Sequence, residues 1–434
     1  MSSDEVKTNS ISRRRFLKVG SSAAAAAIVA GIGGYLAYQQ ATTPPPESNP
    51  IKLGLLSSMT GALADYGFWN LRVTTAAVDY VNRNGGIAGR PVELVVEDDT
   101  TDPTTGARKM RRLILESEVD FVIGSIHSGV NIACNPVAKE RKTLHFANGE
   151  AYETTAGKGN RYVFRVISNV RAQVKPIPRW AIEEQGLGRK WTLVAMDYSF
   201  GWAHRDWLPP ALAEAGGELL DVILVPLGTT DFTPFIPKIP SETEVLYHVV
   251  VGPGRAAFLQ QLKDFGFKGR QLFFVDSIEG SPVEPRDLLE GSWVWEAFPR
   301  RLASYDTPAN REYRTLVGVD EEGRAVEDPN RHTVFSHMYS YWETVFLLKQ
   351  AIEESGWRSK TDDPTLIRTL EKGLTVNEGI EHPQGSKTLR AEDHQFFTQH
   401  WMSLVEDGKL NVKVRFPKEE SIYTPEVDYT TESI

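Results

Sequence analysis

The chain has 434 residues, of which 41% are hydrophobic, 24% charged and 10% aromatic. This is a globular composition, and it excludes a collagen, a coiled coil or a disordered chain as the main body. The formal net charge is −9, from 48 basic and 57 acidic residues, so we expect no nucleic-acid partner. The single cysteine, Cys134, excludes an intrachain disulfide and a cysteine-rich zinc site.

Residues 1–41 have the layout of an export signal. A polar segment ends in Ser-Arg-Arg-Arg-Phe-Leu-Lys at 12–18, and an uncharged stretch rich in Ala and Gly follows at 19–38. The consecutive arginines followed by Phe-Leu-Lys resemble the twin-arginine signal of prokaryotes. The apolar stretch is also about as long as a membrane span, so we expect the body to be either released or tethered by an uncleaved signal. The Pro-rich residues 42–50 then indicate an extended linker.

The body begins with short apolar strands that alternate with helices. The pattern predicts strands at 51–56, 92–96, 119–123 and 143–147, and helices at 62–83, 104–116 and 130–140. Near-continuous apolar strands separated by helices are typical of a parallel sheet that is covered on both faces.

The alternation starts again after residue 168. It predicts helices at 172–185, 202–215 and 254–264, and strands at 191–195, 219–225, 245–251 and 271–275. Further elements are expected at 292–297 (strand), 305–318, 333–355 and 364–372 (helices) and 387–416 (a β-rich tail).

These patterns predict an α/β fold of two doubly wound parallel-sheet lobes joined by a hinge of several strands. We expect the N-terminal lobe to hold 51–168 plus about 299–398, and the C-terminal lobe to hold 169–298 plus about 399–434. Sheets of this kind bind ligands beyond the carboxyl ends of their strands. With two lobes, that position is the cleft between them, and hinge closure around a small ligand is the expected motion.

Several short motifs follow one another along the body: Ile-Lys-Leu-Gly-Leu-Leu-Ser-Ser-Met-Thr-Gly at 51–61, Val-Asn-Arg-Asn-Gly-Gly-Ile-Ala-Gly-Arg at 81–90, Glu-Asp-Asp-Thr-Thr-Asp-Pro at 97–103, Phe-Val-Ile-Gly-Ser at 121–125 and Asp-Tyr-Ser-Phe-Gly at 197–201. In order and spacing they resemble the type I periplasmic solute-binding proteins of the leucine/isoleucine/valine-binding family. The resemblance covers about residues 51–410.

This resemblance implies a Venus-flytrap protein that is not an enzyme. It implies the extracytoplasmic, monomeric substrate-binding component of an ABC transporter, which captures a small polar solute and delivers it to a membrane permease. A branched-chain or related amino acid is the solute that the family favours. Amides, urea and aromatic carboxylates remain alternatives, as does a ligand sensor that signals to a membrane partner.

The resemblance also implies where the solute binds. The positions that correspond to the family's binding residues are Tyr66, Ser128, Gly149, Ala151, Phe200 and Asp276. Ser128 would offer its hydroxyl to the solute carboxylate, at the start of a helix whose N-terminus attracts anions. Its alternative role is simply to cap that helix.

The carboxylate that holds the solute ammonium corresponds to Asp276, through a charge-assisted bond. Family members more often have Glu-Gly at this point, and Glu279 lies three residues later. Glu150 is either a second acid for a cationic ligand or a solvated loop residue. Tyr198 is a nearby substitute for Phe200 as the aromatic side chain of the second lobe.

An exported enzyme with a cofactor is a third possibility for a chain with this signal. The sequence contains no P-loop, no Gly-x-Ser-x-Gly elbow and no His-Glu-x-x-His motif. We therefore expect no catalytic residues, no cofactor and no metal.

Overall fold

The computed structural model describes residues 49–280 and 286–434, so the expected signal and most of the expected linker lie outside the described residues. Pro50–Ile434 form one compact unit. Among the described helices, none is both long and apolar enough to cross a membrane.

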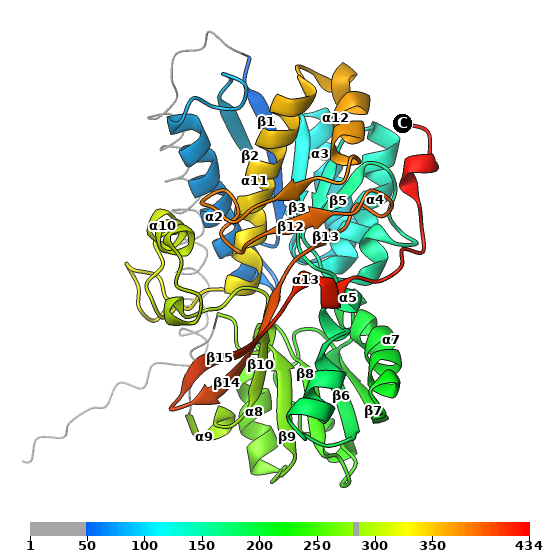
Figure 1. The fold of residues 1–434 in the computed structure, drawn as a ribbon, viewed down its shortest axis with the longest axis vertical. Helices are drawn as coiled ribbons and strands as arrows, with labels where there is room; N and C mark the ends of the chain where they lie inside the picture. The colour runs from blue at the N-terminus through cyan, green and yellow to red at the C-terminus, as the bar shows by residue number, and fades with distance from the viewer. Residues whose placement is uncertain (1–48, 281–285) are drawn as a thin grey trace, which may run out of the picture. The chain divides into compact units, whose positions relative to one another are not determined.

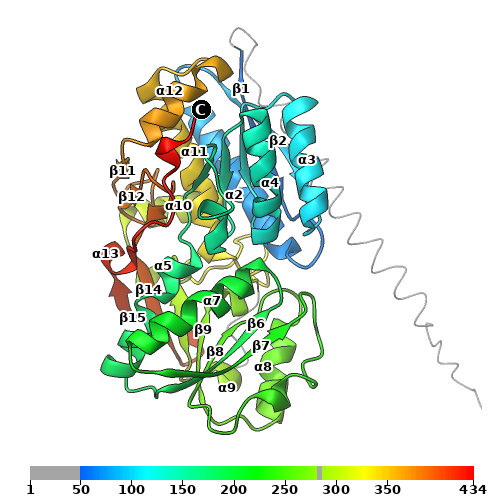
Figure 2. The same ribbon diagram turned by 90° about the vertical axis from the view of Figure 1, so that its right-hand side faces the viewer.

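A five-stranded parallel sheet forms the first lobe, in the order β2-β1-β3-β4-β5. Its strands are β1 (Ile51–Ser57), β2 (Val92–Asp98), β3 (Phe121–Gly124), β4 (His145–Ala147) and β5 (Val163–Arg165). Its helices are α2 (Ala64–Arg83), α3 (Pro103–Leu115), α4 (Ser128–Arg141) and α11 (Phe335–Ser355). Helix α2 packs against α11, and α3 packs against α4 (Figures 1 and 2). The apolar strands are thus covered, as their composition predicts.

A seven-stranded sheet forms the second lobe, in the order β15-β14-β10-β9-β8-β6-β7. The parallel strands are β6 (Lys190–Met196), β7 (Glu218–Val225), β8 (Val245–Val249), β9 (Arg270–Phe274) and β10 (Trp293–Glu296). Two antiparallel strands, β14 (His400–Glu406) and β15 (Lys409–Phe416), extend the sheet at β10. Helices of this lobe include α7 (Ser199–Glu214), α8 (Arg255–Asp264) and α9 (Arg286–Leu289).

The helix expected at 172–185 is broken into short pieces. They are α5 (Val170–Val174), α6 (Ile177–Arg179) and a π-helical turn at Trp180–Glu184. The cause is proline, because Pro176 and Pro178 cannot donate the backbone hydrogen bonds that a continuous helix needs.

The chain passes between the lobes several times. It leaves the first lobe after β5 and the second lobe after β10, and it returns to the second lobe through β14. The segment between β10 and β14 carries α10 (Pro308–Val317), α11 and α12 (Asp363–Leu370). It also carries a small sheet of β11 (Thr375–Val376), β12 (Lys387–Leu389) and β13 (Phe396–Phe397).

The C-terminal tail leaves the second lobe after Phe416. It contains α13 (Lys418–Ser421) and then runs back to the first lobe. There the Tyr429 hydroxyl donates to the carbonyl of Ala156, and Lys139 Nζ lies 2.9 Å from Glu432 Oε2. This path differs from the boundary expected from the sequence, which assigned everything after about residue 399 to the C-terminal lobe.

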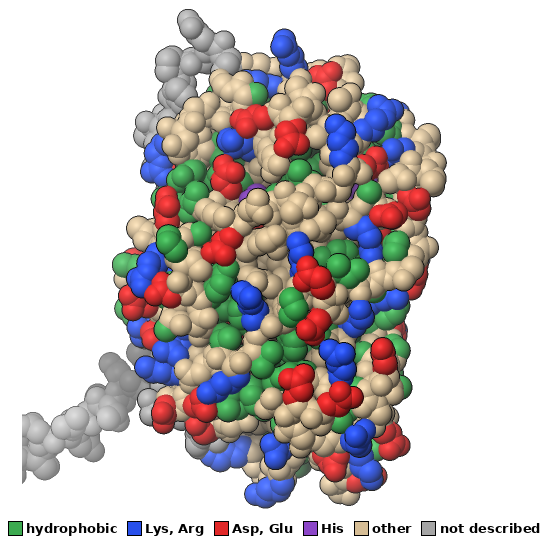
Figure 3. Space-filling view, in the orientation of Figure 1, with side chains coloured by type: hydrophobic (Ala, Val, Ile, Leu, Met, Phe, Trp, Pro, Cys, Tyr) green, Lys and Arg blue, Asp and Glu red, His purple; other side chains and the backbone are tan. Residues whose placement is uncertain are grey.

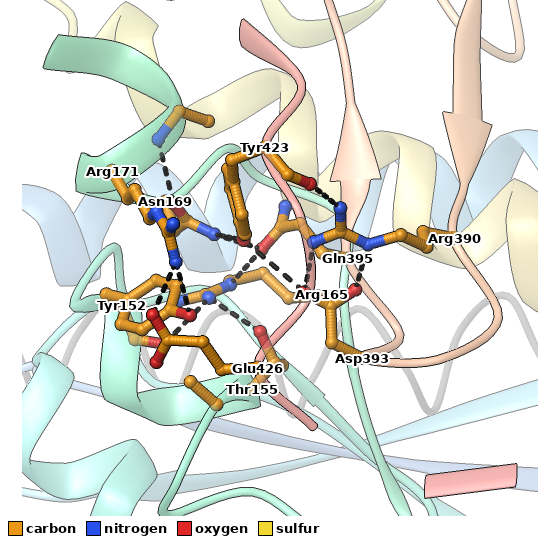
Figure 4. A network of polar contacts seen from close by, with 12 residues as sticks. Tyr152, Thr155, Arg165, Asn169, Arg171, Arg390, Asp393, Gln395, Tyr423 and Glu426 are labelled. Atoms are coloured by element: carbon orange, nitrogen blue, oxygen red, sulfur yellow. Dashed lines mark hydrogen bonds and ion pairs between the residues drawn. The ribbon is translucent and has the colours of Figure 1, made fainter. Parts of the chain in front are cut away.

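A buried arginine fastens the passage between the lobes (Figure 4). Arg165, at the end of β5, is fully buried. Its guanidinium donates to the carbonyls of Gly149 (3.1 Å) and Ala151 (2.5 Å) and to Thr155 Oγ1 (2.6 Å). It also donates to Gln395 Oε1 at 2.7 Å, and Gln395 belongs to the segment that leads back to β14. One side chain therefore holds the loop after β4 and two interlobe passages together.

Charged side chains of both signs are interspersed on one face of the molecule. On the face of the described residues that Figure 3 draws, Lys and Arg lie among Asp and Glu, and no basic patch gathers there. That face therefore offers no run of positive charge to a phosphate backbone.

Replacing Arg165 should cost much of the stability of the fold. Arg165→Ala leaves several buried carbonyls without a donor, so we expect a loss of about 3 kcal/mol or more in the free energy of unfolding, measured by urea denaturation. Arg205→Ala is the control, because Arg205 only pairs with Asp206 on the surface and should cost less than about 0.5 kcal/mol. Equal losses in the two variants would contradict the role of Arg165.

Candidate functional site

The loops beyond the carboxyl ends of strands from both lobes meet around one small cavity. Its volume is about 10 Å³, close to that of a single water-sized probe. The lining residues are Leu63, Tyr66, Ile126, Ser128, Glu150, Tyr198, Phe200, Val251, Asp276 and His337. The cleft is therefore closed, and side chains fill most of it.

Ser128 is the first residue of α4 and is 1% exposed. The cap of this helix is His127, whose Nδ1 accepts from the Val130 amide at 3.1 Å. The alternative in which Ser128 only caps the helix is thus wrong. Its hydroxyl instead accepts from the Ala151 amide at 3.1 Å and faces the cavity.

Gly149 and Ala151 support the site without lining it. Their carbonyls accept from Arg165, and the Ala151 amide is held by Ser128. A Cβ atom on Gly149 would lie 2.4 Å from Asn131 Nδ2 and 2.8 Å from the Ser128 Cα, so only glycine fits here. The residue between them, Glu150, is the one that reaches the cavity.

Two carboxylates and one imidazole converge on the cavity. Asp276 follows β9 in the second lobe, whereas Glu150 and His337 belong to the first lobe. His337 Nε2 lies 2.9 Å from Asp276 Oδ1 and 3.7 Å from Glu150 Oε2. All three side chains are at most 4% exposed. We call these three residues the acid–histidine cluster.

Neighbouring side chains hold parts of the cluster in place. Gln173 Nε2 donates to Glu150 Oε1 at 2.5 Å. The Tyr66 hydroxyl lies 3.5 Å from Asp276 Oδ1, and the Tyr66 ring meets the His337 ring edge-on at 5.3 Å. The contacts of Asp276 with Tyr66 and His337 join the two lobes.

Burial and mutual charge set the protonation of the cluster. Burial raises the pKa of Glu150, and the charge of Asp276 raises it further. Burial alone would lower the pKa of His337, but the charges of Glu150 and Asp276 outweigh it and raise that pKa. Burial, followed by the charges of Asp276 and Glu279, raises the pKa of Tyr66, so its hydroxyl stays protonated. His337 is therefore an imidazolium beside Asp276, whereas Glu150, whose pKa burial raises to about 8, keeps its proton far more readily than an exposed glutamate.

The remaining wall of the cavity is apolar. It consists of Leu63 and Ile126 from the first lobe and of Phe200 and Val251 from the second. This wall offers van der Waals contact to an aliphatic group but no hydrogen bonds.

Four of the six expected binding residues line the cavity, namely Tyr66, Ser128, Phe200 and Asp276. Sequence reasoning missed His337, which lies in the first turn of α11, 61 residues beyond Asp276. No local pattern marks it, because α11 is buried along almost its whole length and its first turn looks like ordinary core sequence. Glu150 and Tyr198, named as secondary candidates, both face the cavity.

Known proteins resemble this chain throughout its body. A family model described as "Periplasmic binding protein" matches residues 50–409. The Leu/Ile/Val-binding protein homolog 6 of Brucella melitensis is 26% identical over 286 residues, which cover 64% of this chain and 70% of the relative. Homolog 4 of Brucella abortus is 22% identical over 361 residues, which cover 80% of this chain and 82% of the relative.

Two solved structures show the same fold. One is a solute-binding protein of an ABC transporter from Rhodopseudomonas palustris, in complex with 3,4-dihydroxybenzoic acid. It has a TM-score of 0.73 and 19% identity over 86% of this chain and 98% of the other. The second is a branched-chain amino acid transporter substrate-binding protein from Streptococcus pneumoniae, in complex with isoleucine. Its TM-score is 0.66, with 18% identity over 85% of this chain and 100% of the other.

The loop that carries Glu150 should not tolerate a side chain at position 149. For Gly149→Ala we expect a loss of about 1–3 kcal/mol in unfolding free energy, because the new methyl group would collide with Ser128 and Asn131. Gly379→Ala is the matched control, since a Cβ at Gly379 meets nothing within 4 Å. Urea denaturation measures both, and a neutral Gly149→Ala would show that the loop can move aside.

Proposed function

Because the chain belongs to the periplasmic binding protein family and is an extracytoplasmic solute-binding protein of an ABC transporter rather than an enzyme, we propose that its solute is an amino acid with an aliphatic side chain. The carboxyl groups of Glu150 and Asp276 would hold the ammonium group, and the closed cleft would present the solute to a membrane permease. We further propose that the protein works as a monomer.

The observation that carries this proposal is the pair of buried acidic side chains. Glu150 and Asp276 come from different lobes and face the same cavity. A buried carboxylate needs a counter-charge, and a solute ammonium supplies one through charge-assisted hydrogen bonds. Since Asp276 belongs to the second lobe, a solute that binds it also favours closure.

The opposite end of an amino acid is a carboxylate, and Ser128 stands in a suitable place for it. Its hydroxyl faces the cavity from the first turn of α4. The backbone amides and the dipole at a helix N-terminus favour a negative charge. The apolar wall of Leu63, Ile126, Phe200 and Val251 is then left for the aliphatic side chain.

The closed cavity of about 10 Å³ is too small for any amino acid. The lobes must therefore separate before the solute enters, and the 2.9 Å contact between His337 and Asp276 must give way. In this scheme the solute ammonium takes over the role of counter-charge that His337 has in the closed cleft.

An aromatic carboxylate, as in the Rhodopseudomonas structure, fits this cavity less well. It would place a further negative charge beside Glu150 and Asp276, and His337 is the only cationic side chain among the lining residues. Neutral amides and urea escape this repulsion but leave one carboxylate without a counter-charge.

A thermal-shift panel tests the proposed solute. The full-length protein is unfolded and refolded to remove any bound ligand, then heated with each amino acid, with short amides, urea and aromatic acids. A solute present at about a hundred times its Kd stabilises the protein by about 2.7 kcal/mol, which is a clear shift in Tm. We expect the shift with aliphatic amino acids.

Two variants connect the shift to the cavity. Asp276→Asn should weaken binding by about 10- to 100-fold because it removes the bond to the solute ammonium, and Ser128→Ala by about tenfold because it removes the bond to the solute carboxylate. Asp197→Asn is the control, since Asp197 is an exposed acid that accepts from Trp202 Nε1 at 2.7 Å. A shift with aromatic acids alone, or one that Asp276→Asn leaves unchanged, would refute the ammonium site.

We also propose export by the twin-arginine route. Replacing Arg13 and Arg14 together by lysine should keep the protein inside the cell, because the pair is the signal, whereas Arg15→Lys should leave export unchanged. Protease accessibility of intact cells measures the exported fraction. Unimpaired export of the double variant would refute this route.

A further inference from the structure

The acid–histidine cluster combines three side chains that bind metal ions in many proteins. One ligand atom each from Glu150, Asp276 and His337 can be chosen so that all three lie within 4.8 Å of one another. We propose that these three side chains bind a divalent transition-metal ion of the zinc type, which bridges the two lobes in the closed cleft.

The distances within the cluster match those of a coordination shell. Zinc binds nitrogen and oxygen ligands at about 2.0–2.2 Å, so the ligand atoms of a tetrahedral site lie about 3.3 Å apart. His337 Nε2 lies 2.9 Å from Asp276 Oδ1 and 3.7 Å from Glu150 Oε2, on either side of that value. Small rotations of the side chains would therefore bring the three atoms around one ion.

A second observation points to a ligand at this place. Asp276 Oδ2 is buried and accepts no hydrogen bond from any described residue. A buried carboxylate oxygen without a partner is costly, and a cation bound to it removes that cost. Asp276 also lines the cavity of about 10 Å³, whose size suits one ion or water molecule without any opening of the lobes.

Charge and ligand type favour a transition metal. Two carboxylates and a neutral imidazole balance the two positive charges of the ion, so its binding releases the proton of His337 and any proton that Glu150 holds. Calcium and magnesium prefer ligand sets made only of oxygen, whereas an imidazole with two carboxylates suits zinc, cobalt or nickel. The bond from Gln173 to Glu150 Oε1 orients one ligand from outside the coordination shell, as is common in metal sites.

The metal site goes beyond the proposed function. It depends on that function only in one respect, since both require the closed cleft. The ion and a solute ammonium would use the same oxygens of Glu150 and Asp276, so each should exclude the other. Competition between Zn²⁺ and the solute then follows, and the two ligands can be tested separately.

Zinc binding to the full-length protein tests the inference. After treatment with a chelator, the protein is titrated with Zn²⁺ against a chromophoric competitor, and we expect one ion per chain. Titration with Co²⁺ gives a second readout on the unaltered protein, because tetrahedral coordination produces intense visible absorption bands.

Variants locate the ion. His337→Gln removes the nitrogen ligand but keeps both carboxylates, and we expect it to weaken Zn²⁺ binding by more than about 100-fold. His332→Gln is the matched control, since His332 lies five residues earlier and only its backbone carbonyl contacts Trp69, so it should bind Zn²⁺ as the parent does. Circular dichroism confirms that each variant is folded.

The outcomes separate the two hypotheses. One ion per chain, lost in His337→Gln and kept in His332→Gln, supports the metal site. Failure to bind stoichiometric Zn²⁺, or binding that His337→Gln leaves unchanged, overturns it. Amino-acid binding without Zn²⁺ binding overturns the metal site alone, and Zn²⁺ binding without any amino-acid shift supports the metal site while overturning the proposed solute.

Discussion

The closed state of this protein depends on the burial of one carboxylate, that of Asp276, between the two lobes. Removing a carboxylate from water costs several kcal/mol unless a counter-charge and hydrogen bonds compensate. The first lobe supplies both, through His337 at 2.9 Å and the Tyr66 hydroxyl at 3.5 Å. When the lobes separate, water can solvate the same carboxylate. Separation of the lobes would therefore exchange the contacts of Asp276 with His337 and Tyr66 for contacts with water.

The loop that carries Glu150 is positioned by a second buried charge. Arg165 fixes the carbonyls on both sides of Glu150, and it reaches Gln395 in a different interlobe passage. The loop that carries Glu150 is therefore anchored at the hinge rather than at the cavity. A hinge motion that disturbed Arg165 would also move the loop that carries Glu150, and this links the hinge physically to the cavity.

The fold could be predicted from the sequence to the extent that local patterns determine it. The apolar strands of both sheets follow from composition, and Pro176 and Pro178 explain why one expected helix is divided. The three-residue strand β5 (Val163–Arg165) is too short to show a pattern. The path of the tail back to the first lobe rests on long-range contacts such as Tyr429 to Ala156, which no local signal encodes.

The candidate site was predictable where the topology determines it. Residues after parallel strands meet at one sheet edge, which predicts the place of the site, and the family resemblance then named Ser128 and Asp276 within it. His337 could not be predicted in this way, because it comes from helix α11 and not from a loop after a strand. Only the three-dimensional structure shows that the first turn of this helix lies at the cavity. The cap of α4 is His127, which overturns the alternative role of Ser128 as the cap and leaves the Ser128 hydroxyl facing the cavity.

The route of the C-terminal tail has a consequence for labelling the protein. Strands β14 and β15 belong to the second lobe, yet the residues that follow are fastened to the first lobe by Tyr429 and Glu432. A fluorescent protein fused to the C-terminus would therefore travel with the first lobe. Paired with an acceptor dye on an exposed position of the second lobe, such as Lys268, it would report the interlobe angle as energy transfer.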